Sequence, residues 1–170
     1  SQRIGRKTGG IRPSSFTSAI RGVDRSTAWM FLRGKATVAQ TADMFDILRD
    51  VLLTVKLDNQ ERFRQLVLEE KAGEEASLLP QGHIVVNTRL KSHFNEADWA
   101  SERINGIHYL LFLRQLAEDI DQDWASVYAR LETIRQLLVN RSNILVNVTL
   151  DQNNWQQIEP VLANCLSTLP

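Results

Sequence analysis

The sequence predicts an α+β fold, a two-layer domain in which a small, mostly antiparallel sheet carries helices on one face. Two extended segments come first, amphipathic helices follow, and an alternating apolar segment precedes a final helix. Helices that each bury one apolar stripe need a second layer to pack against, and a sheet supplies it. The chain has 170 residues, 43% hydrophobic and 24% charged, which is enough for one core. We therefore expect residues 1–170 to form a single domain.

The N-terminal part predicts a turn followed by two strands. The chain begins with Ser-Gln, without methionine, and we expect it to begin in a turn, as an excised piece of a longer polypeptide would. Residues 11–18 contain β-branched residues and Pro13, which favour an extended segment. The stretch STAWMFLRGK at 26–35 is rich in strand formers. The turn-prone RGVDR between the two segments predicts antiparallel pairing.

The middle of the chain predicts two capped helices. Thr37 followed by Gln40 has the pattern of a capping box, and apolar residues then recur at helical spacing over 42–55. Asp58 with Glu61 predicts the start of the next helix. That helix should turn four apolar side chains inward: Phe63, Leu66, Val67 and Leu79.

The C-terminal part is more helical. Pro80 and Gly82 separate it from the preceding helix. Helical periodicity covers residues 83–94, 96–104, 107–118 and 124–139. Asp123 is the expected cap of the last of these helices. The alternation in NILVNVTL predicts a strand over 143–150, and a final helix follows with Pro160 in its first turn.

Composition excludes several classes of protein. Twenty basic and twenty acidic residues give a formal net charge of zero, so no overall field attracts nucleic acid or an anionic membrane. The apolar cluster YLLFL at 109–113 is too short to cross a bilayer. Cys165 cannot form an internal disulfide and lies on an apolar stripe, which favours burial over reactivity. We expect neither nucleic acid nor membrane as a partner.

The stretch IGRKTGG at 4–10 resembles a phosphate-binding loop only superficially. Such a loop needs a glycine directly before its lysine and must open a helix. Arg6 occupies that place, Ser1 stands where the first glycine would fall, and Pro13 follows. The sequence therefore argues against nucleotide binding.

Metal and nucleophile chemistry have equally weak support. The three histidines, His83, His93 and His108, are too far apart to share a helical turn, and neither H-E-x-x-H nor H-x-x-E-H occurs. The acidic run EEKAGEE at 69–75 is better interpreted as a solvated helix face than as metal ligands or an acid–base pair. No histidine lies near three candidate nucleophiles in the sequence, Ser14, Ser15 and Ser18. The glycosylation patterns at Asn140 and Asn147 are interpreted as chance.

An ordered series of short stretches carries a family resemblance. The stretches are IGRKTGGI at 4–11, RGKA at 33–36, DMFDILRDVLLTVKLDNQERFRQLV at 43–67, GH at 82–83, ADWASERINGIHYLLFL at 97–113, DQDW at 121–124 and RSNILVNVT at 141–149. Together they resemble the presequence proteases, a branch of the pitrilysin and insulysin superfamily of zinc metalloproteases. The resemblance covers nearly the whole chain.

The resemblance implies a place in a larger enzyme. Members are similar in having four homologous α+β domains, whose two halves close around a chamber that admits unfolded peptides. This chain looks like most of the third domain, in the C-terminal half, with its first strands missing. Zinc belongs to the first domain of such enzymes, where an H-x-x-E-H helix and a downstream glutamate hold it. The register at Leu66, with Glu69 and Glu70 a turn later, gives no reason to carry that glutamate over, so no catalytic, metal or substrate-binding residue is assigned here.

The resemblance also assigns a role to the glycines of TGG. In the catalytic domain of the family, a glycine-rich turn leads into a strand that pairs with the substrate peptide. Here that strand carries Arg12 and Pro13, and a proline removes a backbone donor. Gly9 and Gly10 are therefore expected to form a structural turn.

Three hypotheses follow. The first is a non-catalytic chamber-wall domain of a zinc metalloendopeptidase that degrades short unstructured peptides, with the other domains of its parent chain and unfolded peptides as partners. The second is a catalytically inactive homologue that serves as a core or interaction subunit. The third, a free-standing helical module, conflicts with the alternation in NILVNVTL.

The resemblance places the parent inside the cell, in a bacterial cytoplasm or an organelle matrix or stroma. The isolated chain is expected to self-associate through unpaired sheet edges beside Trp29 and Phe31.

Overall fold

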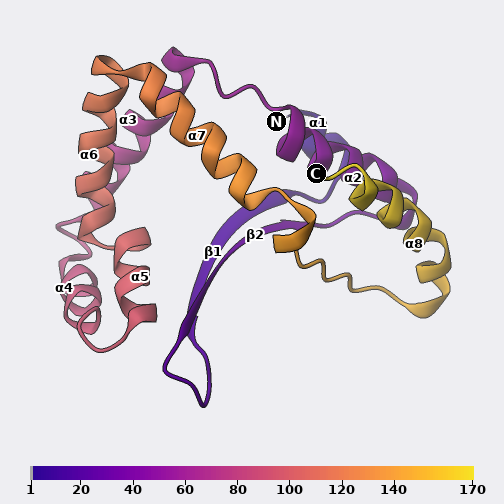
Figure 1. Cartoon of the computed structure of the whole chain (residues 1–170), viewed down its shortest axis with the longest axis horizontal. Coiled ribbons are helices and arrows are strands. Elements are labelled where there is room, and N and C mark those ends of the chain that lie inside the picture. Colours follow the sequence, from indigo (N-terminus) through magenta and orange to yellow (C-terminus); the bar gives the residue numbers. More distant parts are fainter. Residues whose placement is uncertain (1) are drawn as a thin grey trace. The chain divides into compact units, whose positions relative to one another are not determined.

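The computed structural model describes residues 2–170 and confirms the α+β class: a mostly helical chain with one two-stranded antiparallel sheet (Figure 1). The strands are β1 (Ile11–Ala19) and β2 (Ser26–Gly34). The α-helices are α1 (Gln2–Lys7), α2 (Thr41–Arg49), α3 (Gln60–Ser77), α4 (Gly82–Lys91), α5 (Glu96–Asn105), α6 (Ile107–Gln122), α7 (Trp124–Leu138) and α8 (Gln152–Ser167). Three short helical turns are η1 (Val38–Gln40), η2 (Asp50–Thr54) and η3 (Arg141–Asn143).

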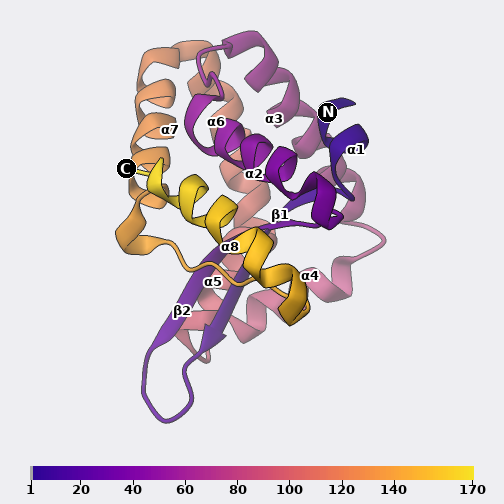
Figure 2. The same cartoon turned by 90° about the vertical axis from the view of Figure 1, so that its right-hand side faces the viewer.

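The hairpin forms where the sequence predicts it. β1 and β2 lie side by side in both views (Figure 1 and Figure 2). At the turn, the amide of Ile20 donates to the carbonyl of Arg25 at 2.9 Å. Gly22 has a φ of 84°, a conformation that only glycine adopts without strain. The RGVDR stretch thus closes the hairpin as expected.

The expectation that the chain begins in a turn is wrong. Residues 2–7 form the helix α1, and the turn comes after it. The hydroxyl of Thr8 donates to the carbonyl of Ile4 at 2.8 Å and so completes the last turn of the helix. Thr8 is buried, so this bond is shielded from water. Sequence periodicity cannot reveal a helix of six residues.

The capping box at Thr37 is wrong in its details. The Thr37 hydroxyl donates to the Gln40 side chain at 3.3 Å instead of accepting from a backbone amide, and the chain forms η1 before α2 begins. Ile47 is the buried apolar residue of α2, whereas the expected stripe leaves Val51 exposed. The π-helical turn η2 shifts the register after Arg49, which explains why one regular stripe over 42–55 does not hold.

The cap of α3 lies one residue later than the sequence suggests. The side chain of Asn59, not Asp58, accepts from the amide of Arg62 at 2.9 Å. Val67 is buried as predicted. Leu79 is 95% exposed, because α3 ends at Ser77 and Leu79 lies in the turn beyond it. The prediction that Leu79 faces inward was wrong.

The chain divides into two compact units. Unit 1 contains the segment up to Arg12 together with Leu32–Leu57 and Tyr128–Pro170, and unit 2 contains Pro13–Phe31 and Asp58–Val127. That residues 1–170 act as a single domain of a larger protein stays a prediction.

Unit 2 has its core between α3, α5 and α6. The buried apolar side chains are Val67, Ala97, Leu110, Leu113, Ile120 and Val127. The amide side chain of Gln60 donates to the carbonyl of Ile120 at 2.8 Å, and Arg64 binds both carboxylate oxygens of Asp121. Asp123 caps α7 as predicted, by accepting from the amide of Ser126 at 3.1 Å. These contacts fix the helices that carry the candidate site.

Unit 1 packs α2 against α8. Ile158 and Leu169 are buried there, and Cys165 is half-buried with its Sγ 3.8 Å from the carbonyl of Phe45. Burial raises the pKa of the Cys165 thiol. Pro160 lies inside α8, not in its first turn, because Asp151 caps the helix much earlier by accepting from the amide of Asn154.

The strand predicted over 143–150 does not form in the described part of the chain. Residues 141–143 are the turn η3, and residues 144–150 have no regular structure. A strand exists only with a neighbour that takes up its backbone hydrogen bonds, and no described segment lies in register with it. The alternation therefore predicted a strand for which the described residues supply no hydrogen-bonded neighbour.

Candidate functional site

The glycine turn joins α1 to β1 and is held from both sides. The amide of Gly9 donates to the carbonyl of Lys35 at 2.7 Å, and the amide of Lys35 donates to the carbonyl of Gly10 at 3.3 Å. The amide of Gly10 also donates to the hydroxyl of Thr8 at 3.1 Å. Gly10 has a φ of 115°, where a side chain would strain the backbone. The geometry fits a structural turn, because these backbone groups already bind Lys35 and Thr8.

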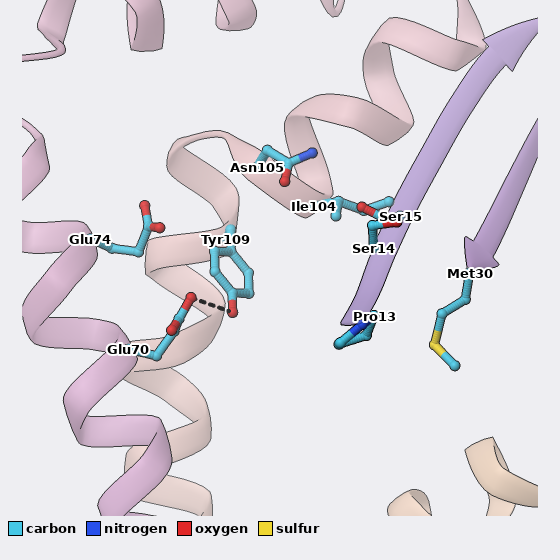
Figure 3. Close-up of a pocket in the computed structure, with 9 residues that line it drawn as sticks. All are labelled: Pro13, Ser14, Ser15, Met30, Glu70, Glu74, Ile104, Asn105 and Tyr109. Carbon is cyan, nitrogen blue, oxygen red and sulfur yellow. Dashed lines mark hydrogen bonds between the residues drawn. The ribbon is translucent and has the colours of Figure 1, made fainter. Parts of the chain in front are cut away.

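Unit 2 contains a cleft of about 510 Å³ bounded by the hairpin on one side and by α3 and the α5–α6 junction on the other (Figure 3). It is lined by Pro13, Ser14, Ser15, Met30, Glu70, Glu74, Ile104, Asn105 and Tyr109. In Figure 3 the two glutamates come from one helix and Tyr109 lies between them and the hairpin. The cleft is therefore polar on the α3 side and mixed on the other.

The two glutamates of the cleft have no cationic partner among the residues that the structure describes. Glu70 accepts only from the hydroxyl of Tyr109, at 3.4 Å, and the side chain of Glu74 has no hydrogen bond. Their neighbour Glu75 differs, because it accepts from Arg114 at 2.8 Å. Carboxylates one helical turn apart repel each other, and a cationic group would relieve that repulsion.

The electrostatics of the cleft act on Tyr109. Burial raises the pKa of its hydroxyl, and the charge and hydrogen bond of Glu70 and the charge of Glu74 raise it further. The hydroxyl therefore stays a hydrogen-bond donor at neutral pH. Ser14 and Ser15 have no basic side chain bonded to them in the described chain, so the cleft can bind a polar or cationic group but holds no activated nucleophile.

An apolar groove of about 420 Å³ continues from the cleft between α3 and α6 and shares Glu70 and Tyr109 with it. Its other lining residues are Phe63, Leu66, Val67, Phe112, Leu113 and Leu116. Leu66 and Phe112 are about half exposed, at 46% and 54%. Cleft and groove together form a surface that is acidic at one end and apolar at the other.

A buried carboxylate, that of Glu102, lies near the end of α5, at the α5–α6 junction that borders the cleft. The Glu102 side chain is 1% exposed, and Nδ1 of His108 lies 2.8 Å from one of its oxygens and 2.7 Å from the other. The His108 amide also points to this carboxylate, at 3.4 Å, and Arg89 lies 3.8 Å away. Burial alone would raise the pKa of Glu102, but the hydrogen bonds and charge of His108 and the charge of Arg89 outweigh it, so that pKa is lowered.

The structure separates the residues that sequence analysis considered for metal binding. His83 and His93 are exposed, while His108 pairs with Glu102. The described residues contain no group of three histidine, cysteine or acidic side chains placed to hold a metal ion. Glu102 and His108 supply only two donors, and the guanidinium of Arg89, 3.2 Å from the imidazole, would repel a cation. This donor set does not fit the zinc site of the family.

Sequence reasoning missed Glu102, Glu74 and Tyr109 as parts of a site. A signal for Glu102 was present in ERINGIH, where a glutamate near the end of a predicted helix is followed by a glycine and a histidine. The acidic run was interpreted as a solvated face, which holds for Glu69, whereas Glu70 and Glu74 line the cleft.

In the described part of the chain, no helix is both long and apolar enough for a membrane span.

Comparison with known proteins gives a consistent result. Residues 1–116 match the family model of the segment associated with the peptidases of family M16, subfamily C. The chain is 36% identical over 169 residues, 99% of its length, to presequence protease 1, chloroplastic/mitochondrial, of Arabidopsis thaliana. It is 25% identical over 144 residues (84% of the chain) to the mitochondrial presequence protease of Danio rerio, and 21% identical over 160 residues (94%) to protein HypA of Clostridium perfringens.

The chain spans only a small part of these relatives: 16% of the Arabidopsis protein, 14% of the Danio protein and 16% of HypA. The matches confirm the resemblance to the presequence proteases that the ordered motifs indicated, and they identify the chain with a segment of the C-terminal part of such enzymes. The chain belongs to the family of segments associated with the subfamily C peptidases of family M16.

Proposed function

We propose that the chain is a non-catalytic chamber-wall domain, the third of four, in a zinc metalloendopeptidase that degrades short unstructured peptides. The observation that carries this proposal is the 36% identity to a presequence protease along 99% of the chain. The names of two relatives place those proteins in chloroplasts or mitochondria, which supports an organelle matrix or stroma for the parent of this chain. A bacterial cytoplasm is the other location that we propose.

The chemistry of the described residues supports a wall instead of a catalytic centre. The carboxylate of the buried Glu102 is already bound to His108, and the backbone of the glycine turn is already hydrogen-bonded to Lys35. The cleft contains carboxylates but no nucleophile with a base bonded to it. A wall needs side chains that contact a peptide without reacting with it. The acidic and apolar surface formed by cleft and groove meets that need.

The test uses the full-length parent enzyme. We expect it to bind one zinc ion per chain and to cut an unstructured peptide but not a folded protein of the same length. His108→Asn, with exposed His83→Asn as the matched control, should retain the zinc ion, since the proposal puts the ligands elsewhere. Loss of zinc from a folded His108→Asn enzyme would overturn the non-catalytic assignment.

A second measurement distinguishes the wall domain of an active enzyme from the alternative, an inactive homologue. A parent that binds no zinc and cuts no peptide, yet copurifies with an active subunit, would be the inactive homologue that serves as a core or interaction subunit. Purified residues 1–170 should neither bind stoichiometric zinc nor cut peptides, and a chelator-sensitive peptidase activity in that fragment would contradict both versions.

A further inference from the structure

The cleft carries a negative charge that none of its own lining residues balances. Cleft and groove both lie within unit 2, since every residue that lines them belongs to Pro13–Phe31 or Asp58–Val127. The cleft is lined by two carboxylates, Glu70 and Glu74, and none of the described residues around it is a lysine, an arginine or a histidine. Its other polar side chains are two serines, an asparagine and a tyrosine, all without charge at neutral pH.

The same unit shows how its other carboxylates take up a cation. Glu75 accepts two hydrogen bonds from Arg114, at 3.0 Å and 2.8 Å. Asp121 accepts two from Arg64, at 2.7 Å and 3.0 Å. An arginine pairs well with a carboxylate because its planar guanidinium presents several N–H groups at once. The two carboxylates of the cleft are left without such a partner in the described part of the chain.

Tyr109 adds a second feature that favours an arginine. Figure 3 shows its ring between the two glutamates and the hairpin, and its hydroxyl donates to Glu70 at 3.4 Å. A guanidinium can stack on an aromatic face while its edge binds a carboxylate, whereas the ammonium of lysine acts as a point charge. Arg103, which lies 5.2 Å from the centre of the Trp99 ring, shows that stacking elsewhere in unit 2.

The groove restricts the ligand to something larger than a cation. Groove and cleft share Glu70 and Tyr109, so a group bound in the cleft has the apolar groove beside it. Leu66 and Phe112 in the groove remain about half exposed. A metal ion or a small amine would leave that apolar surface in water. A peptide with a cationic side chain close to an apolar one would cover both parts of the surface.

We propose that the cleft binds an arginine side chain of an unfolded peptide and that the groove binds an apolar side chain of the same peptide. The inference rests on the proposed function, because it takes the peptide to be one that the wall meets in the chamber. It deepens that function by naming the chemistry that this wall selects and the residues that select it. Lysine fits the same place less well, since it cannot bind a carboxylate through two parallel N–H groups and stack at the same time.

Peptide binding to the full-length parent tests the selection. The probe is a fluorescently labelled, unstructured peptide with one arginine and a leucine two positions away on each side, because side chains two apart lie on one face of an extended chain. Two matched peptides carry lysine or citrulline in place of the arginine; citrulline has nearly the same shape without the charge. A chelator stops cleavage, and fluorescence anisotropy measures the dissociation constants. We expect arginine to bind about 5-fold more tightly than citrulline, with lysine between them. Equal binding of the arginine and citrulline peptides would overturn the proposal.

Substitutions in the cleft connect that preference to named residues. Glu74→Gln should weaken the arginine peptide to the affinity of the citrulline peptide and leave the citrulline peptide unchanged. Glu69→Gln is the matched control, because Glu69 is exposed on the same helix and does not line the cleft. A Glu74→Gln enzyme that keeps the full preference for arginine would contradict the proposal, since the arginine would then bind elsewhere.

A second pair of variants tests the groove. Phe112→Ala should weaken all three peptides about 3-fold, because the leucines lose apolar contact area. Leu111→Ala is the control: Leu111 is 49% exposed, close to the 54% of Phe112, but it does not line the groove. Equal effects of the two substitutions would remove the groove from the proposal.

The main competing occupant is a basic side chain of the parent itself. In that case the arginine and citrulline peptides would bind equally, and Glu74→Gln would lower the melting temperature of the parent, because an internal ion pair would be lost. That result would overturn the proposal.

Failure of this inference is distinguishable from failure of the proposed function. An active zinc peptidase that binds the arginine and citrulline peptides equally would keep the proposed function and lose the arginine site. A parent that binds no zinc and cuts no peptide, yet prefers arginine in a manner that Glu74→Gln abolishes, would keep the site and lose the proposed function.

Discussion

The imidazole Nδ1 of His108 forms a hydrogen bond of 2.8 Å with Oε1 of Glu102, across the glycine that separates α5 from α6. The bond ties the end of one helix to the beginning of the next, between residues six positions apart. Because the Glu102 side chain is almost fully buried, losing its partner would leave a polar group without water to replace it. The pair therefore fixes the junction that borders the cleft.

This pair predicts a pH dependence of stability. The pKa of Glu102 is lowered in the folded chain by His108 and Arg89, against the effect of burial, which raises it. A lowered folded pKa contributes stability above the unfolded value of about 4.3 and loses it as the pH falls through the folded pKa. We expect Glu102→Gln to unfold more easily than the parent sequence at pH 7, and we expect this difference in the free energy of unfolding to shrink as the pH falls below the unfolded value. Urea melts across this range measure the difference, and exposed Glu69→Gln is the control. A difference between the two proteins that stays constant from pH 7 down to pH 3 would contradict the assignment.

Gly106 predicts a steric effect at the same junction. A Cβ there would lie 2.6 Å from the Glu102 carbonyl oxygen and 2.8 Å from its Cγ, so Gly106→Ala should destabilise the chain by about 1–3 kcal/mol. Gly73, in the middle of α3, has no atom within 4 Å of an added Cβ. Gly73→Ala should therefore stabilise by about 0.5–1 kcal/mol. Equal effects of the two substitutions in thermal melts would show that the junction is not tightly packed.

The cleft predicts a coupled titration. Burial, then Glu70 and Glu74, raise the pKa of Tyr109, so replacing both glutamates by glutamine should bring that pKa closer to its ordinary value near 10. Absorbance titration of phenolate in a Tyr128→Phe background isolates Tyr109. Glu69→Gln, on the exposed face of α3, should leave the titration unchanged. An unaltered pKa in the double variant would mean that the glutamates do not face Tyr109.

The packing of α3 predicts opposite outcomes for two residues that the sequence treats alike. Phe63 is partly buried with its ring 5.8 Å from that of Trp124, so Phe63→Asp should cost roughly 2 kcal/mol or more and, in the parent, reduce activity through misfolding. Leu79 is almost fully exposed, and Leu79→Asp should leave the melting of residues 1–170 unchanged. If Phe63→Asp melts like Leu79→Asp, Phe63 does not pack against Trp124.

The unpaired strand edges predict self-association of the isolated chain. Trp29 is 42% exposed on β2, and no third strand pairs with β1 or β2 among the described residues. Exposed edges next to apolar side chains seek partners. Light scattering at several concentrations should show mass increasing with concentration. A strictly monomeric particle with one sharp urea transition would indicate that residues 1–170 already form a complete domain.

Local chemistry explains which elements the sequence could predict. The hairpin, the helices α3 to α7 and the cap at Asp123 follow from turn residues, periodicity and a side chain within three residues of its target. Predictions failed where two candidates stand side by side, as with Asp58 and Asn59, because either side chain can reach the first free amides. They failed also at α1, which is too short for periodicity to show.

The cleft could not be predicted, because its lining residues come from segments far apart in the sequence. Tyr109 and Glu70 are separated by 39 positions, and nothing in either neighbourhood indicates the other. Glu74 and Glu75 look equivalent in the acidic run, yet one lines the cleft and the other binds Arg114. A difference of about 100° around a helix decides between them, and only the packing of α3 against α6 fixes that angle.

By itself, the sequence determined the α+β class, the hairpin, most helices and the family, because these depend on local propensity and on an ordered series of motifs. It also determined that residues 144–150 favour a strand. The tertiary structure decided that Glu102 and His108 meet, that Glu70 and Glu74 remain without a cation among the described residues, and that 144–150 pairs with no strand there. Pairing and burial are relations between distant segments, and their free energy appears only when the chain has brought those segments together.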